Sequence, residues 1–574
     1  MIFMKKAFPG RVYLFVFFFL SSVLLFSQKQ YNVWYFGTNN ALDNALPGAG
    51  LDFNPNPPQA LFNSAMNFTE GCASICDSST GQLLFYTNGD TIWDRTHQIM
   101  SNGAGISDWR ILSSTQSAVI TPKPGDANKY YVFCNAGAPT GGGTGVYYSV
   151  VDMNLNAGLG GVTIQKAIPL LSQTTSEKMT AVRHANGTDF WIITNLIISN
   201  TYYAYHVSAA GVSAPVITSI GPVDTYGGVH HLKASPKRDK LATDFWTNDP
   251  ITGGTETGFF CFNNASGVLS NYIKIQDSSE GFGTGLSFSP DGNLLYLALG
   301  EEPQPVYQYD MNSIDPKSTK TQVGTVQGEG YLGDGIAYDI QIAPDGKLYF
   351  SIPATYISPV ILSQSRVDVI QSPNVKGPGC GFISRAISLG SDRTGWYSFP
   401  NVITDYLYKD TVTFIPPVAD LGNDTLLCSG ESLILGEKNQ GNMYYWSTGE
   451  TTQSISVTAE GTYAVAINPG CPAATDNVAV EYKNCDIGSL YIPGSFTPNG
   501  DGKNDVFFVY GNNVSQFSMV IYNRWGGKVF ETHDILEGWD GNNNAYESVY
   551  ICSVEGDVLG EGKVSLMQRV TLIR

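Results

Sequence analysis

Short runs of β-branched and aromatic residues, separated by turns rich in Gly, Asn, Asp and Pro, follow one another along most of the chain. Residues 83–86, 130–133 and 190–193 are examples of such runs. Runs of this kind, bounded by turn residues, predict β-strands, and the helical period is nearly absent. The pattern therefore predicts an all-β fold.

One of the turns repeats at a regular interval. Ser-Pro-Asp-Gly at 289–292 precedes an apolar run, and Ala-Pro-Asp-Gly follows at 343–346, 54 positions later. A degenerate copy, Ser-Pro-Lys-Arg, stands at 235–238, 54 positions before the first. Because a Pro-Asp-Gly turn reverses the chain into the next strand, the repeat indicates a recurring structural unit.

Looser pairs of a turn and an aromatic strand extend the repeat to seven members. They begin at residues 81, 128, 187 and 395, so the intervals run from about 47 to 59 residues. Four-stranded blades around a channel fit such intervals, because each blade buries its faces only against its neighbours. We predict a seven-bladed β-propeller over residues 31–410, with the strand at 33–36 closing the ring against the last blade near Trp396.

The N-terminus predicts export. Lys5, Lys6 and Arg11 precede an apolar run at 12–26, which ends abruptly in polar residues. A basic start, a short apolar run and a polar end are typical of a secretory signal peptide, here placed at 1–28. The run is shorter than the ~20 residues of a membrane-spanning helix, although an uncleaved anchor remains the alternative.

A second unit is predicted after the linker marked by Pro416 and Pro417. Residues 418–485 alternate polar and apolar positions around a central Trp446. This pattern predicts an Ig-like β-sandwich, with another small β-domain as the alternative. Because Cys428 and Cys471 flank its strands and an exported chain meets an oxidising compartment, we predict a Cys428–Cys471 disulfide. The nine cysteines are an odd number, so at least one lacks an intrachain partner.

The last unit, residues 488–574, predicts a small antiparallel β-sandwich of six or seven strands with aromatic-rich turns. It contains three distinctive blocks, at 496–505, 522–526 and 538–541. Trp525 and Trp539, one in each of the later blocks, are both expected to pack against the sandwich. The residues of the blocks are Phe496, Thr497, Pro498, Asn499, Gly500, Asp501, Gly502, Asn504, Asp505, Tyr522, Asn523, Arg524, Trp525, Gly526, Gly538, Trp539, Asp540 and Gly541.

In order and spacing, these three blocks closely resemble the gliding motility-associated C-terminal domain, the type B sorting signal of the type IX secretion system. The resemblance implies that the signal peptide takes the chain to the periplasm and that the outer-membrane translocon recognises the C-terminal domain. It implies a final place on the outer cell surface or outside the cell. One departure is visible at 542–548, where the family usually carries a longer hairpin.

The other two units also carry resemblances. The Ser-Pro-Asp-Gly turns resemble those of WD40-like and TolB-type propellers, and this likeness concerns architecture and not the ligand. Residues 421–455 resemble the PKD/Ig-like spacer modules of bacterial surface proteins.

The first block raises the question of a metal. Asn499, Asp501, Asn504 and Asp505 supply oxygen ligands within seven residues, which suits calcium. The spacing is not that of an EF-hand. Asx and Gly residues that only form a rigid turn are the favoured alternative. No other cofactor is expected.

The charge and the scattered histidines exclude other functions. A net charge of −18 argues against binding of nucleic acid, whose phosphates need clustered Lys and Arg. His230 and His231 precede an apolar strand, where a structural or surface role is favoured over a metal site. The Gly-rich stretch at 141–145 lacks the lysine and helix of a phosphate-binding loop.

No residue pattern predicts an active site, so the chain is expected not to be an enzyme. We predict an exported binding or adhesion protein whose propeller takes an unknown extracellular glycan or protein ligand, since abundant Tyr, Trp and Asn suit such contacts. The alternative is an exported propeller hydrolase or lyase that acts on polysaccharide. Clustered acidic residues with raised pKa values at the mouth of the propeller would favour the enzyme.

Overall fold

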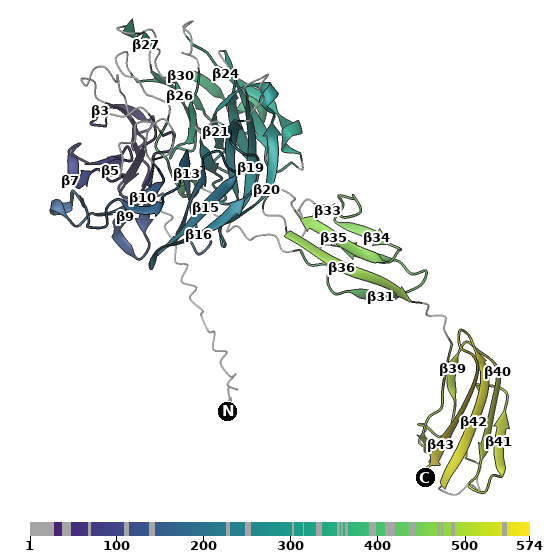
Figure 1. Cartoon of the computed structure of the whole chain (residues 1–574). Coiled ribbons are helices and arrows are strands. Elements are labelled where there is room, and N and C mark those ends of the chain that lie inside the picture. Colours follow the sequence, from purple (N-terminus) through teal and green to yellow (C-terminus); the bar gives the residue numbers. More distant parts are fainter. Residues whose placement is uncertain are drawn as a thin grey trace, which may run out of the picture. The chain divides into compact units, whose positions relative to one another are not determined.

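The computed structural model divides the chain into two compact units (Figure 1). The first comprises Met1–Pro417 and Asn468–Ala473, and the second comprises Val418–Ile467 and Ala474–Arg574. The predicted signal peptide lies outside the described residues except for its last position, and so do the Pro416–Pro417 linker and most of the 542–548 hairpin. The structure describes residues 28–36, 48–66, 70–107, 114–136, 144–225, 230–246, 254–300, 303–313, 315–328, 336–352, 356–357, 360–361, 365–389, 398–407, 419–436, 444–467, 471, 474–483, 488–541 and 548–574.

In the part of the chain that the structure describes, seven antiparallel sheets form the blades of the first unit. The second and third are joined into one hydrogen-bonded sheet where β11 meets β7 in parallel. The first three sheets contain β1 (Val33–Phe36), β2 (Gly48–Asp52) and β3 (Gln59–Ser64); β4 (Ala73–Cys76), β5 (Leu83–Thr87), β6 (Thr91–Asp94) and β7 (Ile99–Ala104); and β8 (Ala118–Lys123), β9 (Asp126–Asn135), β10 (Val146–Asp152), β11 (Gly161–Val162) and β12 (Ile168–Leu171).

The remaining four sheets have four strands each. They contain β13 (Thr175–Arg183), β14 (Phe190–Leu196), β15 (Thr201–Ser208) and β16 (Gly211–Ser219); β17 (Leu232–Ala234), β18 (Lys240–Trp246), β19 (Thr255–Asn263) and β20 (Val268–Gln276); β21 (Gly283–Phe288), β22 (Leu294–Leu299), β23 (Gln304–Asp310) and β24 (Thr321–Val326); and β25 (Asp339–Ile342), β26 (Leu348–Ile352), β29 (Arg366–Ile370) and β30 (Phe382–Ser388). A small pair, β27 (Tyr356–Ile357) and β28 (Val360–Ile361), and the 3-10 turns η1 (Asn156–Gly158), η2 (Ser278–Glu280), η3 (Pro316–Thr319), η4 (Gly377–Cys380) and η5 (Thr404–Leu407) complete the unit.

The seven sheets close into a ring. Their first strands, β1, β4, β8, β13, β17, β21 and β25, contact one another in chain order. The last sheet meets the first through Tyr349 of β26, whose ring centroid lies 6.1 Å from that of Trp34 and 5.3 Å from that of Phe53. The ring of blades is therefore closed, and the predicted seven-bladed propeller is confirmed.

Each of the repeated turns leads into an apolar strand, as the sequence predicts, and joins the first strand of its blade to the second. The turn at 289–292 connects β21 to β22, and that at 343–346 connects β25 to β26. Gly292 and Gly346 have φ values of +66° and +80°, which favour a residue without a Cβ atom.

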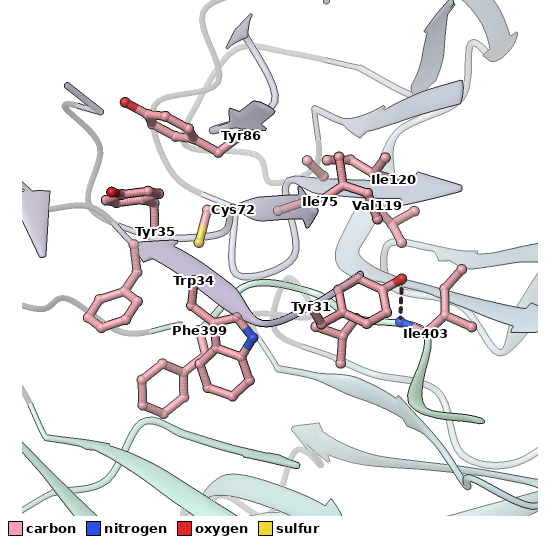
Figure 2. Packing of buried hydrophobic residues seen from close by; sticks show 14 of the residues in the cluster. Tyr31, Trp34, Tyr35, Cys72, Ile75, Tyr86, Val119, Ile120, Phe399 and Ile403 are labelled. Carbon is pink, nitrogen blue, oxygen red and sulfur yellow. Dashed lines mark hydrogen bonds between the residues drawn. The ribbon is translucent and has the colours of Figure 1, made fainter. Parts of the chain in front are cut away.

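The composition of the seventh blade differs from the prediction. The strand at 33–36, β1, does not complete the last blade but begins a three-stranded blade with β2 and β3. Trp396 lies outside the described residues, and Ser398 and Phe399 lie in no blade strand. The ring instead closes by packing of side chains between neighbouring faces. Trp34 is fully buried, and its ring centroid lies 5.3 Å from that of Phe399. Figure 2 shows the two side chains next to each other.

The second unit begins with a two-sheet sandwich around Trp446. This side chain is fully buried, and its indole N–H donates to the carbonyl of Thr452 at 2.8 Å. The sandwich is as expected, while its assignment as a PKD/Ig-like module stays a prediction. One sheet has the order β31 (Thr425–Cys428), β36 (Ala474–Lys483), β35 (Gly461–Ile467), β33 (Tyr444–Trp446), and the other pairs β32 (Leu433–Gly436) with β34 (Ser454–Val457).

The predicted Cys428–Cys471 disulfide is wrong. Cys471 is bonded to Cys261 of β19, 210 positions earlier in the chain. Although Cys471 lies between β35 and β36 in sequence, the segment Asn468–Ala473 belongs to the first unit, and the Cys471 side chain packs in the hydrophobic cluster that contains Phe259 and Leu295. Cys428 is disulfide-bonded too.

A seven-stranded sandwich forms the C-terminal end of the second unit. Alternating residues of its large sheet, such as Met519 and Ile521, point into a core that also holds Trp539. No helix among the described residues is long and apolar enough to span a membrane. The large sheet has the order β38 (Ser495–Phe496), β43 (Gly562–Leu572), β42 (Ser548–Val558), β40 (Val514–Tyr522), β41 (Lys528–Thr532), and β37 (Ser489–Tyr491) pairs with β39 (Tyr510–Asn512).

Candidate functional site

The axis of the propeller, where the first strands converge, is occupied by the chain's own residues 398–407. The backbone N–H of Phe399 donates to Asp339 Oδ2 of β25 at 2.9 Å. The hydroxyl of Thr404 donates to the carbonyl of Ala234 in β17, also at 2.9 Å. Farther along, Asp405 Oδ2 lies 2.7 Å from Arg183 Nε at the end of β13. This axial segment is therefore held by three different blades.

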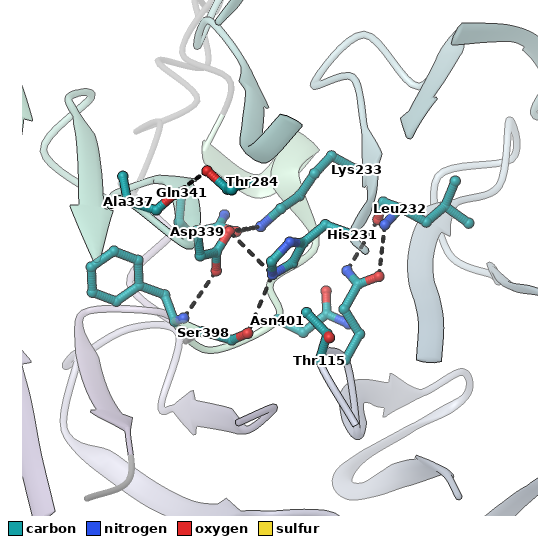
Figure 3. A network of polar contacts seen from close by, with 12 residues as sticks. Thr115, His231, Leu232, Lys233, Thr284, Ala337, Asp339, Gln341, Ser398 and Asn401 are labelled. Atoms are coloured by element: carbon teal, nitrogen blue, oxygen red, sulfur yellow. Dashed lines mark hydrogen bonds and ion pairs between the residues drawn. The ribbon is translucent and has the colours of Figure 1, made fainter. Parts of the chain in front are cut away.

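A buried polar network surrounds the beginning of the axial segment (Figure 3). Lys233 Nζ lies 2.7 Å from Asp339 Oδ1 and donates to Gln341 Oε1 at 2.8 Å. His231 Nε2 lies 3.5 Å from the same Asp339 oxygen and 3.2 Å from Ser398 Oγ. The five side chains come from β17, from β25, from the residue before β17 and from the axial segment, so the network joins the ring to its centre.

The neighbouring Ser398, His231 and Asp339 do not form a catalytic triad. In a triad the serine and the carboxylate engage opposite nitrogens of the imidazole, whereas here both face Nε2. Burial, together with the cations of Lys233 and Lys178, holds the pKa of His231 well below its usual value. His230 and His231 are both buried, so the surface role considered for them is wrong, and the structural role stays a prediction.

A pair of carboxyl groups lies near the start of β13. Glu177 Oε2 accepts hydrogen bonds from the N–H of Thr115 at 2.8 Å and from its hydroxyl at 2.6 Å. Burial, and then the negative charge of Glu70, raises the pKa of Glu177 to about 7. A carboxyl group that titrates near neutrality is the feature that the enzyme alternative requires, but the Glu177 side chain is 1% exposed.

Two of the three C-terminal blocks meet in the core of the last sandwich. Phe496 and Trp539 are buried, and their ring centroids lie 5.4 Å apart. The backbone groups of Trp539 exchange hydrogen bonds with those of Phe507 at 2.8 and 2.9 Å. A Cβ atom on Gly538 would lie 2.5 Å from Val506 Cγ1, so this close approach requires glycine. These blocks therefore build the fold.

The middle block lies elsewhere, at the tip of the hairpin between β40 and β41. Contrary to the expectation from the sequence, Trp525 does not pack against the sandwich: its side chain is 78% exposed, against 1% for Trp539. The physical reason is the tight turn at 523–527, which ends β40 at Tyr522 and carries Trp525 beyond the sheet.

The match to a family model decides what the last sandwich is. Residues 490–559 match the CHU_C Type IX secretion signal domain, and this range includes all three blocks. The chain carries a type IX secretion signal domain. The secretion signal domain indicates interaction with the type IX secretion machinery and delivery to the cell surface or the extracellular space.

Solved structures resemble the chain only loosely. A Bacteroides fragilis protein assigned as a 6-phosphogluconolactonase aligns with 64% of this chain and 98% of its own, at 11% identity and a TM-score of 0.37. Another from Bacteroides uniformis aligns with 59% of this chain and 95% of its own, at 14% identity and a TM-score of 0.33. The periplasmic gluconolactonase of Pseudomonas aeruginosa aligns with 64% of this chain and 97% of its own, at 14% identity and a TM-score of 0.32. No curated protein matches the sequence.

The turn at 499–505 of the secretion signal domain, whose oxygens suit calcium, directs these oxygens to backbone groups. Asp505 accepts the N–H groups of Gly500 and Gly502 at 2.6 and 2.7 Å, and Asp501 Oδ1 accepts that of Lys503 at 2.8 Å. These bonds are what a rigid turn needs. Among the residues that the structure describes, no group of three or more His, Cys, Asp or Glu could hold a metal ion. Calcium bound by Asn499, Asp501, Asn504 and Asp505 stays a prediction.

Neither the axial segment nor its polar network was predicted from the sequence. Lys233 and Asp339 were the available signals, because each is a charged residue in a short strand that otherwise carries mainly apolar residues. Charged side chains are almost never fully buried unless they are paired, so two such residues indicate a buried pair. The ion pair between them could not be predicted, because the sequence does not show which blades face each other across the axis.

Proposed function

We propose that the exported chain is a binding or adhesion protein, with its ligand-binding surface on the outside of the propeller. Export itself rests on the secretion signal domain at 490–559. The ligand would be an extracellular glycan or protein. A net charge of −18 and a charged-residue content of 14% favour a ligand recognised mainly through neutral polar groups over an anionic polymer.

The observation that carries the proposal is the filled axis of the propeller. A propeller with an open central channel could bind a ligand there. In this chain, residues 398–407 lie at the axis, against the inner strands of the blades. Ser398, Thr404 and Asp405 are all buried, as are the His231 and Asp339 groups that they contact or adjoin. The hydroxyl, imidazole and carboxyl groups of these residues are therefore kept from solvent. The outer surface of the propeller remains for contacts with other molecules.

The aromatic residues expected to make these contacts are mostly buried. Within the described part of the propeller, the aromatic side chain with large exposure is Phe62, at 43%. Tryptophans such as Trp34, Trp93 and Trp191 serve the core instead. The proposal therefore depends on polar and loop residues more than on aromatic stacking.

A binding screen with the mature full-length chain tests the proposal. The labelled chain is applied to a glycan array and to purified surface proteins, and the same chain after thermal unfolding is the control. We expect saturable binding by the folded chain alone to one class of glycan or to one protein. Absence of saturable binding, together with release of sugars from a polysaccharide, would overturn it.

The carboxyl groups of Glu177 and Glu70 favour a second candidate function, an exported hydrolase or lyase that acts on polysaccharide. A carboxyl group with a pKa of about 7 suits a general acid. Release of reducing ends from polysaccharides by the intact chain, abolished by Glu177→Gln and retained by the exposed Glu450→Gln control, would support this function. Unchanged release with Glu177→Gln would exclude Glu177 as the acid.

A further inference from the structure

The tip of the β40–β41 hairpin exposes a large aromatic side chain next to a cation. Trp525 is 78% exposed, and Arg524 Cζ lies 4.4 Å from the centroid of its ring. Arginine over the face of an indole is a cation–π contact, and Trp and Arg are the residues most enriched at the centres of protein interfaces. A fold that merely needed a turn here would not require either side chain.

The backbone holds this tip in one conformation. Asn523 Oδ1 accepts the N–H groups of Trp525 at 3.0 Å and of Gly527 at 2.9 Å. The N–H of Asn523 donates to the carbonyl of Gly527 at 2.9 Å, and Gly526 has a φ of +78°. A preorganised tip loses little conformational freedom when it binds, so its geometry favours recognition.

The strands β40 and β41 of this hairpin lie in one sheet with β42 and β43 (Figure 1), and the outer face of that sheet adjoins the tip. In the register of the sheet, Tyr522 lies opposite Ile551, and Ile551 lies opposite Arg569. Val549, 44% exposed, and Met567, 72% exposed, lie on the same face, because their neighbours along each strand point into the core. Tip and outer face form one partly apolar surface.

Near the tip, the charge of this surface is opposite to that of the chain, while the carboxylates of Glu555 and Asp557 lie on the same outer face farther from the tip. Arg524 and Arg569 are exposed cations on a chain of net charge −18, while nearby Lys528 is paired with Glu531. Complementary charge steers partners together and suppresses wrong ones. A second copy of the chain would bring the same cationic tip to the contact, so the surface fits an acidic partner of another kind.

We propose that the Arg524–Trp525 tip and the outer face beside it dock the secretion signal domain onto a protein component of the type IX secretion machinery. The tip lies within the residues that match the signal domain, and a folded signal has to be recognised through its surface. The partner presents an apolar recess for Trp525, with carboxylate groups that face Arg524 and Arg569. This inference concerns export and does not depend on the ligand of the propeller.

Export of full-length variants in the native host tests the docking surface. Trp525→Ala and Arg524→Glu are compared with Leu536→Ala, a control whose side chain is 81% exposed but follows β41 at the opposite end of the hairpin. We expect the ratio of external to periplasmic protein to fall about tenfold or more for Trp525→Ala and Arg524→Glu, as for loss of an interface hot spot. Leu536→Ala should leave the ratio of external to periplasmic protein unchanged. Trp525→Phe, which keeps an aromatic ring, should be exported nearly as well as the intact chain.

Melting of the purified variants separates docking from folding. Unchanged melting with lost export supports the proposal, and normal export of both Trp525→Ala and Arg524→Glu overturns it. If Trp525→Ala lowers the melting temperature, export of Arg524→Glu alone tests whether the tip docks. A chain without residues 488–574 is run beside them: if that chain is also exported, the sorting role itself fails, which is a different result from failure of the tip.

Discussion

The side-chain amide of Asn401 donates a hydrogen bond of 2.7 Å to the main-chain carbonyl of Met179, 222 positions earlier. Met179 lies in β13, and Asn401 lies on the axial segment. The N–H of Asn401 also donates to the carbonyl of Cys72 just before β4, at 2.8 Å. One residue thus ties two blades together from the inside of the ring.

Removal of the Asn401 side chain should destabilise the propeller. Asn401→Ala leaves the buried Met179 carbonyl without this donor, which costs about 1–3 kcal/mol in the free energy of unfolding. Urea denaturation of the full chain measures the change, and the exposed Asn312→Ala is the control. Equal midpoints for the two variants would show that the axial segment does not brace the ring.

The local features of the fold could be predicted from the sequence. The turns around Gly292 and Gly346 consist of residues that favour turn conformations whatever their tertiary surroundings, and a strand follows each turn. The blocks that contain Phe496 and Trp539 are likewise contiguous, so their order and spacing can be recognised. The number of blades could therefore be predicted from the sequence. One of the seven differs, because it is built from β1, β2 and β3 and not from the segment near residue 395.

Features that depend on distant residues could not be predicted. Cys471 stands between β35 and β36 of the sandwich around Trp446 in sequence, yet its partner is Cys261, and no spacing rule gives that pairing. Trp525 and Trp539 look alike in sequence, each beside glycine in a distinctive block, but one is exposed and the other buried. Burial is a property of the tertiary contacts, which local patterns do not fix.

The Cys261–Cys471 disulfide should stabilise the folded chain. Closing a loop of 210 residues corresponds to about 5 kcal/mol in the chain-entropy model, so Cys261→Ser combined with Cys471→Ser should lower the denaturation midpoint clearly. Mass mapping of unreduced peptides should find residues 261 and 471 in one linked pair. A peptide that links Cys471 to Cys428 would contradict the structure.

Glu177 should make the propeller less stable as the pH rises. Its pKa is raised from 4.5 to about 7, so the native state binds this proton more tightly than the unfolded state does. Stability is then lost between pH 4.5 and about 7, by about 3 kcal/mol in total. Glu177→Gln keeps a neutral acceptor for Thr115 and should be more stable than the intact chain at pH 8 but not at pH 4. Urea midpoints at both pH values measure this, and an identical pH dependence of the two proteins would contradict the raised pKa.

The two tryptophans of the secretion signal domain should differ in their contribution to stability. Trp539→Ala removes a side chain that is 1% exposed and should cost about 3–5 kcal/mol, enough to unfold so small a sandwich. Trp525→Ala should change the free energy of unfolding by about 0.5 kcal/mol or less, because its side chain lies in solvent. Tryptophan fluorescence during denaturation compares them. Equal losses would mean that Trp525 is packed after all.

The most direct test of the export assignment is fractionation of the native host that carries either the intact chain or a chain without residues 488–574. The propeller has its own core, so the shortened chain should fold and remain in the periplasm. The intact chain should appear on the cell surface or in the medium. Delivery of the shortened chain to the outside as efficiently as the intact one would contradict the assignment of the C-terminal sandwich as the export signal.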